Sequence, residues 1–103
     1  GFEMGAVHSA ELPYLFPNFS NKSAFDGPDL AAPSQRLAGQ MAAYWSSFAR
    51  TGRPVPAGFP RWEQFKSERA VMRFEPGRVR EFDAGAAHHC VFWRTLYPQL
   101  LGD

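Results

Sequence analysis

His8 is the residue of this chain whose type and setting most favour catalysis, and it lies in the segment GAVHSAELPYLF. The unperturbed pKa of imidazole lies near physiological pH, so the ring can accept a proton and return it within one reaction cycle. Small residues on both sides favour an accessible tight turn: Gly5, Ala6, Ser9 and Ala10. Taken alone this pattern is weak evidence, because a lone histidine is more often a structural or surface residue than a catalytic one.

Hydrolysis through a histidine base also needs a nucleophile beside the ring and a carboxylate that fixes the far ring nitrogen. No serine of the chain has the G-x-S-x-G pattern, and no HGGG-like run could supply the amides of an oxyanion hole. Ser9 is adjacent to His8 in sequence, but neighbouring side chains on such a turn usually diverge, so we interpret Ser9 as a turn residue. The chain by itself is therefore not expected to be a complete hydrolase.

Metal and cofactor chemistry finds little support in the sequence. The run His88-His89-Cys90 is predicted to lie on a helix, where three consecutive side chains point in different directions and cannot share one ion. Cys90 is the single cysteine, so it is either a buried thiol or the partner of a cysteine outside this chain. No glycine loop suited to phosphate is present. We predict no metal site and no cofactor.

The composition describes one small folded domain and excludes several classes of partner. The 103 residues are 45% hydrophobic and 16% aromatic, which excludes a disordered tail and suggests a surface that packs on something larger. The net charge of +1 comes from interspersed charges, so no nucleic-acid or anionic-membrane surface is predicted. No apolar run approaches the roughly 20 residues of a membrane span. The opening residues, GFEMGAVH, suggest a piece of a longer chain, and the compartment is left undetermined.

The first half of the chain is predicted to hold one long helix. Residues 1–33 contain four prolines and are expected to form loop and short turns. The helix should run from about Ser34, as its cap, to about Arg50, and Gly52 then suits the left-handed residue that ends a helix. Its inner face should be an apolar stripe of Leu37, Met41, Tyr44, Trp45 and Phe48, which we interpret as core packing.

The second half is predicted to contain a hairpin and a closing helix. Two short strands, Ala70–Phe74 and Val79–Phe82, flank a turn with proline and glycine in the favourable order. A lone hairpin is marginal in water, so it should add to an existing sheet. Residues 53–69 should be irregular, with Trp62 and Phe65 as anchors onto the core, and the last helix should span about Ala86 to Tyr97.

Five segments, in order, resemble the type-B carboxylesterases, the family that includes the cholinesterases. The first is GAVHSAELPYLF, which resembles the segment of the catalytic histidine. It is followed by MAAYWSSFARTGRPV, by PRWEQF, by VMRFEPG and by HHCVFWRTLYPQLL. The third segment departs from the family pattern P-x-W-P-x-Y at Glu63 and Phe65.

The resemblance implies an α/β class, specifically the C-terminal portion of an α/β-hydrolase fold with a loop carrying the catalytic histidine, an amphipathic helix, an edge hairpin and a closing helix. Residues 1–103 would then be an incomplete C-terminal segment of that domain. His8 matches the general base, whose serine and acid partners precede it in such chains. Glu11 matches a family glutamate that we interpret as a support for the loop, and Cys90 matches a cysteine that pairs upstream in cholinesterase-like members.

The leading functional hypothesis is therefore part of a serine carboxylic-ester hydrolase that acts through an acyl-enzyme, inactive in isolation. The partners would be the upstream part of the same polypeptide and a small carboxylic ester, with no nucleic acid and no membrane. We also expect self-association through exposed apolar surface. Two alternatives stay open: a non-catalytic, cholinesterase-like adhesion protein, and an isolated remnant domain without activity.

Overall fold

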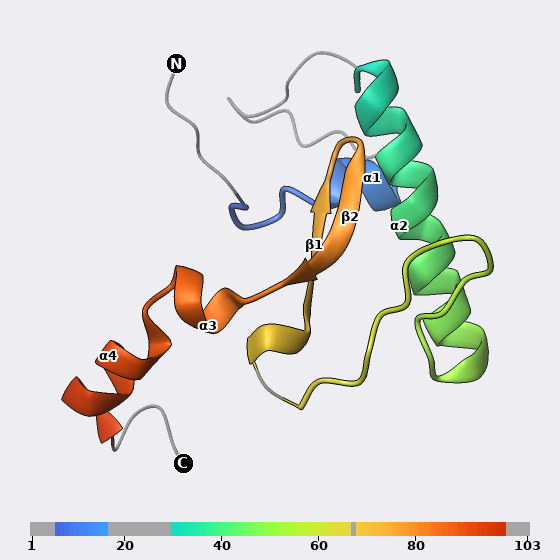
Figure 1. The fold of residues 1–103 in the computed structure, drawn as a ribbon. Coiled ribbons are helices and arrows are strands. Elements are labelled where there is room, and N and C mark those ends of the chain that lie inside the picture. The colour runs from blue at the N-terminus through green and yellow to red at the C-terminus, as the bar shows by residue number, and fades with distance from the viewer. Residues whose placement is uncertain (1–5, 17–29, 67, 99–103) are drawn as a thin grey trace.

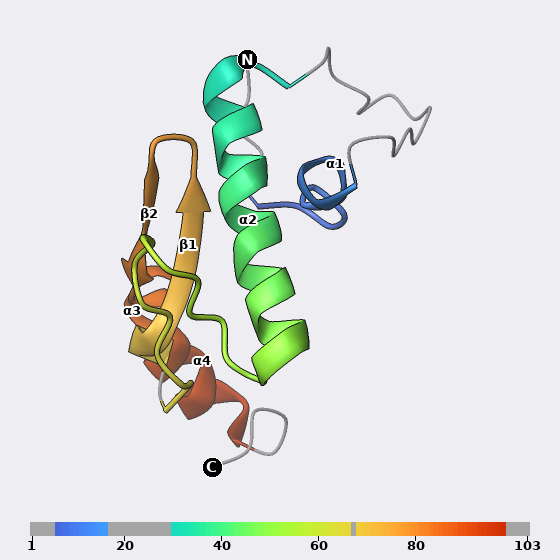
Figure 2. The ribbon, with the colours of Figure 1, turned by 90° about the vertical axis from the view of Figure 1, so that its right-hand side faces the viewer.

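A computed structural model describes residues 6–16, 30–66 and 68–98 of the chain (Figure 1). Its helices are α1 (Leu12–Leu15), α2 (Ala32–Thr51), the short 3₁₀ helix η1 (Glu68–Ala70), α3 (Ala84–Ala87) and α4 (Cys90–Leu96). Its strands are β1 (Val71–Glu75) and β2 (Arg78–Phe82). In Figure 2, α2 stands between the β1–β2 hairpin and α1, and it packs against both of these elements. The long helix is thus the scaffold of the described chain.

Helix α2 begins two residues before the predicted start and ends where the sequence predicts. The prediction that Ser34 caps the helix is wrong: Ala31 is the cap residue and Pro33 lies in the first turn. Proline suits that turn because its fixed φ is already helical and its missing N–H would have no partner there. At the other end Gly52 has a φ of 71° and donates its N–H to the Phe48 carbonyl at 2.7 Å, as predicted for a left-handed cap.

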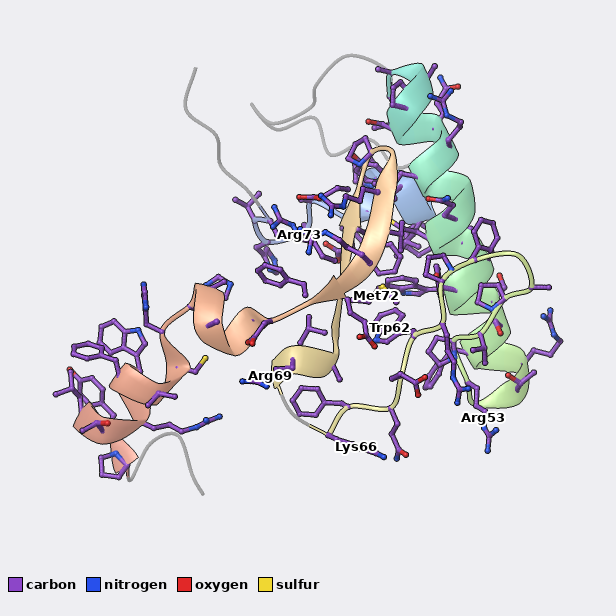
Figure 3. The ribbon with its side chains drawn as sticks, viewed as in Figure 1. Arg53, Trp62, Lys66, Arg69, Met72 and Arg73 are labelled. Atoms are coloured by element: carbon purple, nitrogen blue, oxygen red, sulfur yellow. The ribbon has the colours of Figure 1, made fainter. Side chains whose placement is uncertain are left out.

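The core lies where α2 meets β1 and the segment that leads from the helix to the hairpin. Tyr44 is fully buried, and its ring contacts those of Phe59, Trp62 and Phe74 with centroids 5.4–6.1 Å apart. Figure 3 places Trp62 and Met72 between β1 and α2, and Met72 is buried. The predicted anchor role of Trp62 is therefore confirmed.

Part of the predicted inner stripe is wrong. Leu37, Met41 and Tyr44 are buried. The ring of Trp45 contacts those of Trp62 and Phe74, but its residue is still 41% exposed. Phe48 is exposed, and so is the second predicted anchor, Phe65. Periodicity identifies the apolar side of a helix, but it does not tell how much of that side a neighbour covers. The described chain therefore presents aromatic surface that its own elements leave open.

A cluster of hydroxyl groups fastens the end of α2 to the segment that follows it. Ser47 is buried; its hydroxyl donates to the Arg53 carbonyl at 2.9 Å and accepts the Val55 N–H at 3.3 Å. Thr51 Oγ1 donates to the Ser47 carbonyl at 2.8 Å. These bonds turn the chain back along α2, and so they bring Trp62 to the ring cluster.

The hairpin forms as predicted, within one residue at each end. Strands β1 and β2 are antiparallel, with Val71 opposite Phe82 and Glu75 opposite Arg78. The turn between them contains Gly77 at a φ of 83°, the left-handed residue that glycine adopts without strain. Over the described residues the sheet has these two strands, so the predicted addition to a larger sheet stays a prediction.

The predictions at both ends of the chain need correction. The stretch 1–33 is not all loop, because α1 forms one helical turn with Pro13 in its first positions; residues 1–5 and 17–29 lie outside the described residues. The predicted closing helix is two short helices. Asp83 caps α3 by accepting the Ala86 N–H at 2.9 Å, and His89 then adopts a φ of 52°, which interrupts the helix before α4.

The architecture of helices around a small two-stranded sheet is consistent with part of an α/β fold. In the described ranges no helix combines the length and the apolar character needed to cross a bilayer.

Candidate functional site

His8 lies on the tight turn that the flanking small residues predict. The Ala10 N–H donates to the Val7 carbonyl at 3.2 Å, and the Leu12 N–H donates to the Ser9 carbonyl at 3.2 Å. Ser9 has a φ of 64°, an uncommon conformation for a residue with a side chain. The sequence did not signal this conformation, because serine shows no strong preference for it. The turn holds the His8 side chain in solvent.

Helix α1 anchors this turn to the long helix α2. It follows the turn directly, and its half-buried residues Leu12, Tyr14 and Leu15 belong to the element that packs against α2. The helix consists of four residues, so its stability depends on that packing rather than on its own hydrogen bonds. The position of His8 is therefore set by apolar contacts just after it in sequence.

Glu11 supports the loop through its backbone. Its carbonyl accepts the N–H groups of Tyr14 at 3.0 Å and Leu15 at 3.2 Å, and it occupies the cap position of α1. Its side chain is exposed and makes no capping hydrogen bond. Because any residue has a backbone carbonyl, the expected role of the Glu11 side chain as a support for the loop stays a prediction.

No hydrogen bond or ion pair holds the His8 ring within the part of the chain that the structure describes. A general base needs a group that fixes its tautomer and a nucleophile within about 3 Å. The described residues position an accessible imidazole and leave those two functions to other groups. In combination with such groups the ring could accept and donate a proton.

The histidines and the cysteine near the C-terminus do not join His8. His88 follows α3, His89 precedes α4, and Cys90 is a half-buried free thiol. A shallow pocket of about 680 Å³ lies beside them and is lined by Arg69 and Asp83 among others, but not by His8. Among the described residues no group of three potential ligands could hold a metal ion.

Comparison with known proteins identifies the class of this chain. A model of the carboxylesterase family matches residues 2–93, which include the His8 turn, the scaffold helix, the hairpin and the start of α4. The chain therefore belongs to the carboxylesterase family. That family has an α/β-hydrolase fold, with which the observed helices and small sheet agree.

Individual relatives are named as esterases or hydrolases. The chain is 26% identical over 109 residues to acetylcholinesterase 1 of Caenorhabditis briggsae, a match that covers 95% of this chain and 17% of the relative. It is 34% identical over 70 residues to phenmedipham hydrolase of Pseudarthrobacter oxydans, covering 63% of this chain and 14% of the relative. The fumonisin B1 esterase of Sphingopyxis macrogoltabida is 34% identical over 73 residues, covering 67% and 14%. No solved structure matches the chain.

The chain spans about a sixth of the length of the acetylcholinesterases that it resembles. Most of the length of these relatives therefore lies outside the match.

Proposed function

We propose that this chain supplies the general-base histidine, His8, to a serine carboxylic-ester hydrolase. The observation that carries the proposal is the family match over residues 2–93, which covers an exposed histidine on a tight turn. The segment around this histidine resembles that of the family's catalytic histidine. Fold membership alone does not assign an activity, so the proposal depends on this residue rather than on the fold.

In the proposed reaction His8 accepts the proton of a serine hydroxyl as the serine attacks the ester carbonyl. The protonated ring then delivers that proton to the leaving alcohol, and an acyl-enzyme remains. In the second half-reaction His8 activates a water molecule that releases the carboxylic acid. The serine, the triad acid and the oxyanion hole belong to the rest of the hydrolase, and the chain in isolation is expected to be inactive.

A split-enzyme assay tests the proposal. One component, which we call the body fragment, is phenmedipham hydrolase truncated just before the segment that is similar to this chain. The other component is residues 1–103 of this chain, and the two are co-expressed. Hydrolysis of a p-nitrophenyl ester is measured for the pair and for each component. We expect the pair to hydrolyse the ester and neither component to do so by itself. His8→Ala in the pair should lower kcat 10²–10⁴-fold, because a positioned base contributes about that factor.

His88→Ala is the matched control, since His88 is also an exposed histidine and lies next to α3, away from the turn. Its kcat should equal that of the unchanged pair. A kcat for His8→Ala equal to that of the unchanged pair would remove His8 from the mechanism. A pair that assembles but hydrolyses no ester would favour the non-catalytic alternative.

A further inference from the structure

Ser9, the residue after His8, has an unusual backbone conformation. Its φ is 64°, and within the described ranges His89 is the one other non-glycine residue with a positive φ. Left-handed backbone is uncommon for residues with a Cβ, because that atom approaches the following carbonyl oxygen. Residues held in such conformations cluster at active sites and switch regions, where the surrounding structure maintains them. The conformation of Ser9, directly beside the candidate base, therefore calls for a functional explanation.

The hydrogen bonds around Ser9 define two linked turns. The Ala10 N–H donates to the Val7 carbonyl at 3.2 Å, so the residues between them are the centre of the first turn. His8 has a negative φ and Ser9 a positive one, which is the combination of a type II turn. The Ser9 carbonyl then accepts the Leu12 N–H at 3.2 Å and begins the second turn. Ser9 is thus the joint between His8 and helix α1.

Rotation at this joint would move His8 relative to the rest of the fold. The residues after Ser9 lead directly into α1, which packs against α2, as Figure 2 shows. Changing the φ of Ser9 from 64° to an ordinary value near −60° rotates the chain by roughly 120° about one bond. The imidazole and α1 lie on opposite sides of that bond, so the rotation would carry the ring to a different place. The φ of Ser9 therefore sets the direction in which His8 points from α1.

The contribution of Ser9 is expected to come from its backbone rather than from its hydroxyl. Across residues 6–16, 30–66 and 68–98 the hydroxyl of Ser9 makes no hydrogen bond. Substitution separates the two contributions. Glycine adopts a positive φ freely, alanine keeps the Cβ without the hydroxyl, and a β-branched residue at positive φ is a clear outlier.

We propose that Ser9 is the positioning residue of His8: its left-handed backbone holds the imidazole in the direction that proton transfer requires. The inference rests on the proposed function, since it concerns the reaction in which His8 would act as base. Ser9 acts through His8 and exchanges no proton itself. A misplacement of about 1 Å can lower a catalysed rate roughly 10²-fold, so one backbone torsion is sufficient to control this activity.

Kinetics of the co-expressed pair test this role with three substitutions at one position. Ser9→Val should lower kcat about 10²-fold, because valine disfavours the positive φ and the ring then leaves its place. Ser9→Gly and Ser9→Ala should keep the kcat of the unchanged pair. KM for the p-nitrophenyl ester should stay the same in all three variants, because the base stabilises the transition state and does not bind the ester.

Ala10→Val is the matched control, since it adds the same β-branched side chain one residue later. Ala10 is exposed and has a negative φ, so valine fits there without backbone strain. Its kcat should equal that of the unchanged pair. For every variant kcat is expressed per assembled pair, and co-purification of the two components quantifies the assembled pair.

A spectroscopic measurement on residues 1–103 alone tests the turn without any turnover. In a type II turn the Hα of His8 lies close to the N–H of Ser9, whereas a negative φ at Ser9 favours a type I turn with the two N–H groups close together. We expect a strong nuclear Overhauser effect between the His8 Hα and the Ser9 N–H in the unchanged chain, in Ser9→Gly and in Ser9→Ala. In Ser9→Val the effect between the two N–H groups should replace it. The same pattern in Ser9→Val as in the unchanged chain would overturn the role of the Ser9 backbone.

The kinetic outcomes separate this inference from the proposed function. If His8→Ala loses turnover while Ser9→Val keeps it, the inference is overturned and the proposed function stands. A loss in Ser9→Ala or in Ala10→Val as large as that in Ser9→Val would also overturn the inference, because the backbone of Ser9 would not be its cause. If His8→Ala keeps the full kcat, the proposed function fails and the role of Ser9 in catalysis fails with it, whatever turn the spectra show.

Discussion

Tyr44 is the residue on which the stability of the described chain most depends. It is the one fully buried large side chain among the described residues, and it contacts three aromatic rings. Its hydroxyl donates a hydrogen bond to the Pro60 carbonyl, which fixes the segment between α2 and the hairpin. Two substitutions separate these contributions: Tyr44→Phe removes the hydrogen bond, and Tyr44→Ala removes the ring as well.

The magnitudes follow from burial. Loss of the hydrogen bond should lower the free energy of unfolding by about 1 kcal/mol, the net value of a typical intramolecular hydrogen bond. Loss of the buried ring should cost about 3–5 kcal/mol, as large-to-small aromatic substitutions in cores do. A single small core rarely supplies more than about 3–5 kcal/mol. We therefore expect Tyr44→Ala to abolish cooperative unfolding and Tyr44→Phe to lower its midpoint.

Urea unfolding followed by tryptophan fluorescence measures both effects, since Trp45 and Trp62 adjoin the cluster. The matched control is Phe48→Ala, an aromatic residue of the same helix that is 58% exposed. Its effect should stay within about 0.5 kcal/mol, as for surface substitutions. A cooperative transition for Tyr44→Ala within about 1 kcal/mol of the unchanged chain would refute the assignment of the core.

Three further predictions concern the same part of the fold. Burial raises the pKa of Tyr44 above its ordinary 10.0, so the folded chain holds the phenol proton more tightly than the unfolded chain. The stability that comes from this difference in pKa is fully present below about pH 10 and is lost as the pH rises through the raised pKa. Tyr44→Phe has no phenol proton, so an equal loss of stability at alkaline pH in this variant would contradict the explanation. Ser47→Ala should destabilise the chain by about 1 kcal/mol, because the Arg53 carbonyl and the Val55 N–H each lose one hydrogen bond but keep the one at 3.0 Å between them. Thermal unfolding measures this effect, and Ser46→Ala, at an exposed neighbouring position, is the control variant. Gly52→Ala should cost about 1 kcal/mol from its positive φ alone, since a Cβ there meets no atom within 4 Å; an unchanged urea midpoint would count against this explanation.

The local elements were predictable because their signals are local. Gly52 ends α2 for reasons of backbone sterics, and the turn around Gly77 forms the hairpin within one residue of the predicted bounds. Trp62 could be identified as an anchor from its type and its place between two elements. The class of protein was also available from the sequence, since four of the ordered segments that resemble carboxylesterases fall within the region that the family model matches and the fifth begins in it.

The interruption between α3 and α4 was not predictable from apolar spacing. The residues on both sides of His89 keep helical spacing, and the break depends on a single left-handed residue together with the capping carboxylate of Asp83. The early start of α2 was missed because Pro33 was interpreted as a helix breaker, although proline is favoured in the first turn.

The sequence by itself determined the candidate catalytic residue, His8, because imidazole chemistry and the small flanking residues are properties of a short segment. Only the tertiary structure decided what surrounds that residue and what covers the aromatic side chains. Burial depends on which distant segments meet, so periodicity could not separate buried Tyr44 from exposed Trp45 and Phe48. The same reason applies to the exposure of α4. Its composition is that of a core helix, but the described chain places few neighbours around it, and no sequence pattern reports how many neighbours a helix has.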